Sequence, residues 1–155
     1  MKTSSLLPSV LIGAVASARS MTPMAALATA RLAGERTPGK LVLLDHPLFK
    51  FGALAMGVGE LFGDKMKTAP DRTVFLGLLA RTITAGFAGA ALAPPKRQIA
   101  GAALGVGAAI ASSYAGLAAR KWAMARWGQT STGFVEEAIM FTAANAIANA
   151  KPAHA

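Results

Sequence analysis

Five long apolar stretches divide this sequence, and short connections that contain most of its lysines and arginines separate them. Apolar stretches of roughly 20 residues match the hydrocarbon thickness of a bilayer, whereas the helices of soluble domains carry a charged face. The pattern therefore predicts an all-α protein that is embedded in a membrane as a bundle of about five helices. The expected helices cover residues 5–32, 48–62, 73–92, 99–119 and 133–150.

The composition of the chain supports a membrane protein. Hydrophobic residues make up 54% of the 155 residues and charged residues only 15%, and the mean hydropathy is +0.45. Alanine and glycine supply much of this apolarity, so we expect the helices to approach one another closely through small side chains. Gly59 with Gly63, Gly101 with Gly105, and Gly86 with Gly89 have suitable spacings. One membrane domain over residues 1–155 is expected.

The formal net charge of +9 does not indicate a nucleic-acid-binding protein. The basic residues are dispersed among the connections, and no aromatic platform or basic helix face accompanies them. Anionic lipid headgroups are the more natural partner for these charges. The sequence has no cysteine, and His46 and His154 are isolated in polar segments, so we predict no disulfide, no metal site and no other cofactor.

The amino terminus has two interpretations. Lys2, the apolar residues 6–15 and the small residues 16–18 resemble a secretory signal with its cleavage site. The apolar stretch nevertheless resumes beyond Pro23, as a continuing helix would. We therefore expect this stretch to be retained as the first helix of the bundle.

Three polar residues, Arg19, Ser20 and Thr22, interrupt the first stretch just before Pro23. Proline inside a helix removes a hydrogen-bond donor and clashes with the preceding turn, so we expect the helix to break or kink there. A helix that restarts at this point offers free backbone N–H groups and a positive dipole end, which can bind an anion. The alternative is a helix start capped by a hydroxyl group, without a ligand.

Basic residues do not orient the predicted five-helix chain in a membrane. Five crossings put the two ends of the chain on opposite sides, and each side then carries seven basic residues outside the apolar stretches. Three explanations are open: another signal decides the orientation, one of the predicted stretches is re-entrant, or the protein inserts in both directions and assembles antiparallel. One side would hold Lys2, Lys65, Lys67, Arg72, Arg120, Lys121 and Arg126, and the other Arg31, Arg36, Lys40, Lys50, Lys96, Arg97 and Lys151.

A weak internal similarity links the first and fourth stretches, because residues 13–18 (GAVASA) resemble residues 108–113 (AAIASS). These two stretches cross in opposite directions in the predicted topology, which fits an inverted repeat of the kind found in secondary transporters. Chance similarity between two helices of small residues is the competing explanation.

Charged residues within the apolar stretches are the most informative feature for function, because each costs on the order of 3 kcal/mol near the bilayer centre. We expect arginine to pair with glutamate toward the interior of the bundle. Neighbouring residues on a helix point about 100° apart, so Glu136 and Glu137 cannot share a partner. The candidates for a polar pathway are Arg19, Ser20, Thr22, Glu60, Asp64, Lys65, Arg81, Glu136 and Glu137, and no catalytic residue is predicted.

Several of these candidates belong to a longer pattern in the sequence. It comprises Arg19-Ser20-Met21-Thr22-Pro23, Glu60, Asp64-Lys65, residues 68–73, Arg81, Gly86, Gly89-Ala90, Tyr114, Arg120 and Glu137-Ala138-Ile139. In this pattern the chain resembles a family of small bacterial membrane proteins, domain-of-unknown-function family 4126. The chain departs from the family at Glu136-Glu137, where the family has Glu-Asp, and at residues 65–67, where the family has a proline. The resemblance implies a multi-pass protein of the bacterial inner (cytoplasmic) membrane with a shared polar set, but no activity.

Two functions fit these features. The first is a transporter or channel for a small solute, an ion or a proton, with Arg19, Glu60, Arg81 and Glu137 lining an interior polar site. The second is a non-transporting scaffold or an accessory subunit of a larger membrane complex, whose small-residue faces bind a second copy or a membrane partner. An intramembrane enzyme that acts on lipid has only the carboxylates in its favour, so we predict no enzymatic activity.

Overall fold

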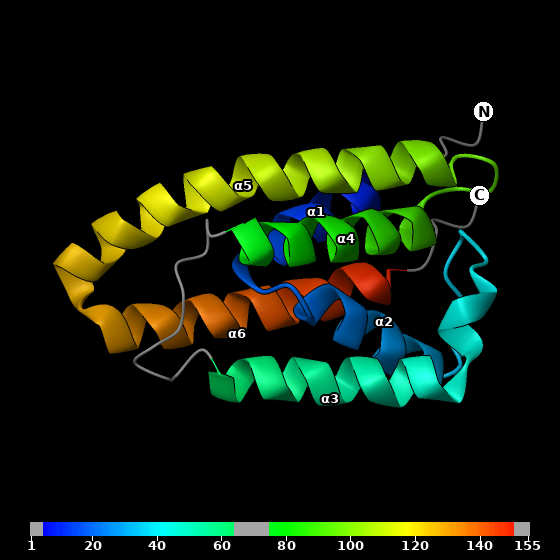
Figure 1. The fold of residues 1–155 in the computed structure, drawn as a ribbon, viewed down its shortest axis with the longest axis horizontal. Helices are drawn as coiled ribbons and strands as arrows, with labels where there is room; N and C mark the ends of the chain where they lie inside the picture. Colours follow the sequence, from blue (N-terminus) through cyan, green and yellow to red (C-terminus); the bar gives the residue numbers. More distant parts are fainter. Residues whose placement is uncertain (1–4, 64–74, 151–155) are drawn as a thin grey trace.

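The computed structural model of the protein describes residues 5–63 and 75–150. Within these ranges the chain forms six α-helices, one short 3₁₀ helix and no β-strand (Figure 1). The all-α prediction is therefore confirmed for this part of the chain. The helices are α1 (Leu7–Ala18), α2 (Thr22–Leu32), η1 (Val42–Asp45), α3 (Pro47–Gly63), α4 (Phe75–Leu92), α5 (Gln98–Trp127) and α6 (Gln129–Ala148).

The predicted boundaries hold best for the second and third stretches. The expected helices at 48–62 and 73–92 agree with α3 and α4 to within two residues. Helix α5 is longer than the prediction and continues to Trp127, because no glycine or proline follows Gly116 until Gly128. Gly128 has a φ of 84°, which ends α5, and α6 starts at the next residue.

The first predicted stretch forms two separate helices. Residues 19–21 separate α1 from α2, and Pro23 lies in the first turn of α2, where a missing N–H costs little. Helix α2 then returns toward the end of the bundle from which α1 starts (Figure 1). Pro8 in α1 and Glu35 after α2 accordingly line the same small cavity. The predicted break is confirmed, and it reverses the chain direction instead of kinking one helix.

The reversal places the two ends of the described chain at one end of the bundle. Pro8 and Ala150 line the same cavity, and in Figure 1 the end of α6 lies at the same end of the bundle as the start of α1. The sequence-based topology, which put them at opposite ends, is therefore wrong. That topology treated residues 5–32 as one helix that runs the length of the bundle, whereas α1 and α2 run in opposite directions.

Helices α1 and α5 run side by side in the same direction. Ser9 faces Gly101, and one turn farther along both helices Gly13 faces Gly105. An inverted relation between residues 13–18 and 108–113 is therefore wrong, for the same physical reason: the reversal after α1 changes the direction of every later helix.

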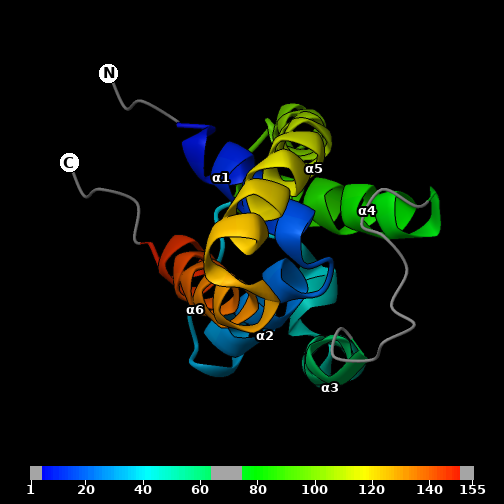
Figure 2. The same ribbon diagram turned by 90° about the vertical axis from the view of Figure 1, so that its left-hand side faces the viewer.

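Alanine and glycine fill the region where α1, α4 and α5 meet, and Figure 2 shows α1 and α4 on the two sides of α5. A Cβ atom added to Gly13 would overlap the carbonyl oxygen of Gly105, and one added to Gly89 would overlap that of Gly101. The hydroxyl of Ser9 also donates a hydrogen bond to the carbonyl oxygen of Gly89, at 2.8 Å. Close approach through small residues is thus confirmed within the chain. Gly59, by contrast, faces open space.

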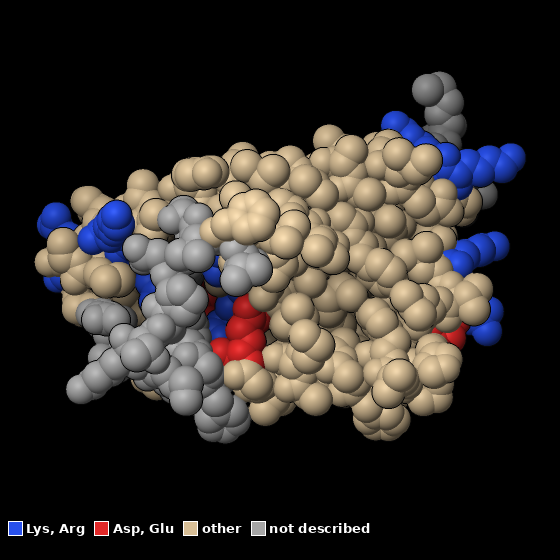
Figure 3. All heavy atoms as spheres, viewed as in Figure 1, with Lys and Arg blue, Asp and Glu red and all other residues tan. Residues whose placement is uncertain are grey.

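Large apolar side chains point outward from all six α-helices. Leu48 is 78% exposed, Phe75 76% and Ile99 88%, whereas most buried apolar residues are alanines. Figure 3 shows the result: uncharged atoms cover most of this face, and lysine and arginine gather at the two ends. Soluble proteins place their large apolar side chains in the core, so this distribution supports an apolar surrounding.

Helix length tests the number of membrane spans. In the part of the chain that the structure describes, α5 alone is both long and apolar enough to cross a membrane, judged by length and composition. Helix α1 and residues Gly77–Leu92 are apolar but shorter. The prediction of about five spanning helices is not confirmed by these lengths.

Candidate polar site at the reversal between α1 and α2

The reversal at residues 19–21 binds a carboxylate from α3. The backbone N–H and the hydroxyl of Ser20 donate hydrogen bonds to Glu60 Oε1, at 2.8 and 2.6 Å, and the N–H of Met21 donates to Oε2, at 2.9 Å. Glu60 thus accepts three hydrogen bonds immediately before α2. Its negative charge lies at the positive end of that helix, where the backbone N–H groups lack partners within the helix.

This arrangement answers the sequence-based question about the start of α2. The anionic group at the start of α2 is a side chain of the protein, 40 residues farther along the chain than Ser20. The alternative of a simple hydroxyl cap is wrong, because no side-chain capping bond is made to α2 and the Ser20 hydroxyl donates to Glu60 instead. Helix α3 is thereby attached to the reversal through Glu60.

An arginine of the same reversal pairs with a glutamate of α6. Arg19 Nη2 lies 3.3 Å from Glu137 Oε2, and the two side chains are only 11% and 25% exposed. The neighbouring Glu136 pairs with Arg120 of α5, at 3.5 Å. Two predictions are therefore confirmed: arginine pairs with glutamate, and the two adjacent glutamates have different partners.

Arg81 is a buried residue of α4, 9% exposed. It lies one helical turn before Ala85, which packs against Ala16 and Ala109 between α1 and α5. Thr22 is also buried, at the start of α2. Of the predicted candidates, Asp64 and Lys65 lie outside the described residues.

Arg19, Glu60, Arg81 and Glu137 share one level of the bundle, which we call the charged layer. Each lies 11 to 13 residues from the end of its own helix that is nearer to Pro8 and Ala150. At 1.5 Å per residue this separation is about 17 to 20 Å. In Figure 3, acidic and basic atoms are visible together within the otherwise uncharged part of the surface. Charges that are distant in the sequence are therefore collected at one depth.

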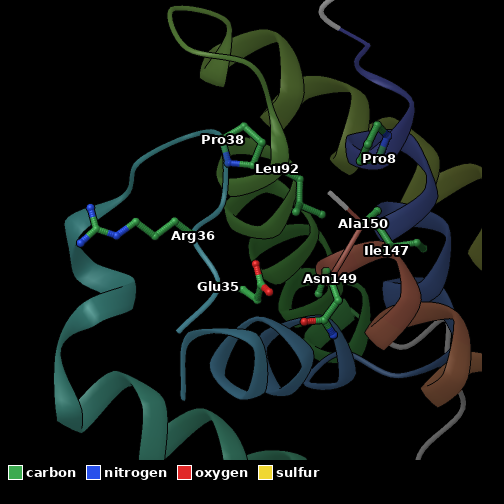
Figure 4. A pocket seen from close by; sticks show the side chains of 9 residues that line it. Pro8, Glu35, Arg36, Pro38, Leu92, Ile147, Asn149 and Ala150 are labelled. Carbon is green, nitrogen blue, oxygen red and sulfur yellow. The ribbon is translucent and has the colours of Figure 1, made fainter. Parts of the chain in front are cut away.

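A small cavity of about 50 Å³ lies at the opposite end from the reversal (Figure 4). Glu35, Leu92 and Asn149 line it together with Pro8, and the side chain of Arg36 extends away from it in Figure 4. No residue of the charged layer lines this cavity. It is therefore separate from the candidate polar site.

The Ser20 hydroxyl provides a test of the hydrogen bonds to Glu60. Replacing Ser20 by alanine removes one donor to a charged acceptor, so we expect a loss of about 1.5 kcal/mol or more in the free energy of unfolding. Thr29→Ala is the matched control on α2, because the Thr29 hydroxyl is exposed and donates only to its own helix, at Ala25. Thermal unfolding in detergent compares the two variants. Equal losses would show that the bond to Glu60 has no special importance.

No family model, no curated protein and no solved structure matches this chain, so the resemblance to a family of small bacterial membrane proteins stays a prediction.

Proposed function

We propose that the chain is an integral membrane protein that moves a small solute, an ion or a proton through the charged layer, at the tip of a re-entrant pair of helices. The observation that carries the proposal is the reversal at residues 19–21, which lies at the same depth as Arg81, Glu60 and Glu137. The exposed large apolar side chains support a lipid surrounding.

Helix α5 gives a scale for the membrane. Its charge-free part, residues 98–119, spans 22 residues, and Lys96, Arg97, Arg120 and Lys121 flank it. This part is about 33 Å long, close to the roughly 30 Å of a hydrocarbon core. The charged layer, about 17 to 20 Å from one border, then lies near the middle of the bilayer.

Helices α1 and α2 are too short to cross on their own. They contain 12 and 11 residues, about 18 and 17 Å, so together they enter to the middle of the bilayer and return. Backbone N–H groups at such a tip need partners inside the protein, because hydrocarbon provides none. Glu60 supplies them here. Broken helices whose ends meet near the midplane are a common construction for solute sites in transporters.

Flux measurements on purified protein in liposomes test this proposal. The wild type should move protons or one member of a panel of small solutes, and Glu60→Gln should abolish that flux, because it removes the carboxylate charge at the start of α2 while keeping the side-chain volume. Glu35→Gln is the control, since Glu35 lies beside the separate cavity. Circular dichroism and gel filtration establish that each variant is folded. Wild-type vesicles that stay closed to protons and to the whole panel would contradict transport.

A scaffold is the second candidate, and one observation favours it. Glu60 and Glu137 already have partners within the protein, as expected if these charges serve only to fix the positions of α3 and α6. A scaffold should co-purify with a defined membrane protein after mild detergent extraction, and Glu60→Gln should reduce that recovery. A single monodisperse species that shows flux would favour the transporter.

A further inference from the structure

Two loops at the end of the bundle that holds Pro8 and Ala150 form one surface. The N–H of Gly39 donates to the carbonyl oxygen of Ala91, at 2.9 Å, and the Gln98 side-chain amide donates to the carbonyl oxygen of Gly39, at 3.3 Å. These bonds fix the loop after α2 against the connection between α4 and α5. The combined surface carries four exposed basic residues, namely Arg36, Lys40, Lys96 and Arg97.

The two lysines of this surface have the left-handed backbone conformation, which is unfavourable for residues other than glycine. Lys40 has a φ of 50° and Lys96 a φ of 69°, and they are the two non-glycine residues with positive φ in the described chain. This conformation costs an L-residue roughly 1 to 2 kcal/mol, and glycine would adopt it without strain. Both lysines are exposed, so their charges are available to a partner at this surface.

The two ends of the bundle differ in charge. Among the described residues one end has Arg31, Arg36, Lys40, Lys50, Lys96 and Arg97, and the other has Arg120, Lys121 and Arg126. At the second end Arg120 pairs with Glu136, and Arg126 lies 5.9 Å from the ring centre of Trp122. At the first end Arg31 pairs with Asp45, at 3.5 Å. We call the first end the basic end.

This comparison counts only the residues that the structure describes, so Lys2, Lys65, Lys67, Arg72 and Lys151 are not part of it.

We infer that the basic end contacts the anionic phospholipid headgroups of the cytoplasmic leaflet, so that both ends of the described chain face the cytoplasm. Short basic loops are retained on the cytoplasmic side, and each cation near an anionic surface contributes about 1 kcal/mol. Trp122 and Trp127, 60% exposed, then lie at the opposite interface, where indoles are enriched. This inference depends on the membrane location that we propose, but not on transport.

Cysteine labelling tests the orientation, and the absence of cysteine from the chain makes the wild type a clean blank. Lys96→Cys and Lys121→Cys are expressed separately, and membrane vesicles of both orientations receive a membrane-impermeant maleimide. Lys96→Cys should react only in inside-out vesicles and Lys121→Cys only in right-side-out vesicles. The reverse pattern, or reaction of either variant in both preparations, would overturn the orientation. Recovery of the protein in the supernatant without detergent would instead refute the membrane location.

Charge removal tests the role of the headgroups. Replacing Arg36, Lys40, Lys96 and Arg97 together by glutamine, in the Lys121→Cys background, should transfer a large part of the labelling to inside-out vesicles. The matched control replaces Lys65, Lys67, Arg72 and Arg126 by glutamine and should keep the original pattern. Adding phosphatidylglycerol to phosphatidylcholine micelles should also raise the Tm of the wild type more than that of the first variant. Unchanged labelling together with equal Tm shifts would overturn the contact with anionic headgroups.

Discussion

Replacing Gly105 by alanine is expected to separate α4 from α5 and to destabilise the bundle by about 3 kcal/mol or more, near the upper end for overpacked cores. A Cβ atom at Gly105 would overlap the carbonyl oxygen of Ala85 and lie 3.2 Å from its carbonyl carbon. Both are backbone atoms, which cannot move aside as the end of a flexible side chain can. The Tm in detergent should therefore fall sharply.

Gly107→Ala is the matched control for this prediction. It makes the same substitution in the same helix, two residues away, and its Cβ would meet nothing within 4 Å. Alanine is the better helix former, so this variant should be as stable as the wild type or slightly more so. Similar Tm values for the two variants would mean that α4 and α5 do not approach at Gly105.

Removing the cation of the partly buried ion pair is the second change with a large expected effect. Arg19→Met leaves the partly buried carboxylate of Glu137 without its arginine, and we expect a loss of about 3 kcal/mol, the lower end of the range for buried pairs. Unfolding in detergent measures this cost. Arg36→Met, at an exposed position of the basic end, should change stability by less than about 0.5 kcal/mol.

A double variant separates two effects, namely the loss of the ion pair itself and the cost of leaving the carboxylate of Glu137 unpaired. Arg19→Met combined with Glu137→Met replaces two charges by apolar side chains, and it should recover at least half of the stability that Arg19→Met alone loses, because no carboxylate is left without its arginine. A double variant that is less stable than the single one would contradict this account of the pair.

The sequence predicts which charged residues form the polar site better than it predicts which groups bind them. Charges inside apolar stretches must find partners, and this requirement predicts that arginine pairs with glutamate, as Arg19 does with Glu137. It does not identify Arg120 as the partner of Glu136, because Arg120 lies outside the predicted stretches. It does not identify the partner of Glu60, which is a pair of backbone N–H groups and a hydroxyl. Backbone donors are present at every residue, so no pattern of residue types marks them.

The reversal after α1 could not be predicted for a related reason. Local chemistry at Arg19 and Pro23 indicates that the helix breaks, but the angle after a break depends on what each half packs against. Here α1 packs onto α5 through Gly13 and Gly105, and α2 packs onto α3 near Gly57 and Ala25. Both partners come later in the sequence. An apolar stretch of 28 residues with a break is therefore equally compatible with one kinked helix and with two helices that run in opposite directions.

The close contact between α1 and α5 has a consequence for biosynthesis. Ribosomes make α1 first, yet the hydroxyl of Ser9 bonds to Gly89, 80 residues later, and Gly13 meets its neighbour only when Gly105 has been made. The contacts of α1 with α4 and α5 can therefore form only after the chain has been synthesised at least as far as Gly105. Truncated chains that end before α5 should consequently remain accessible to proteases at residues 19–21, and the arrival of α5 should protect them.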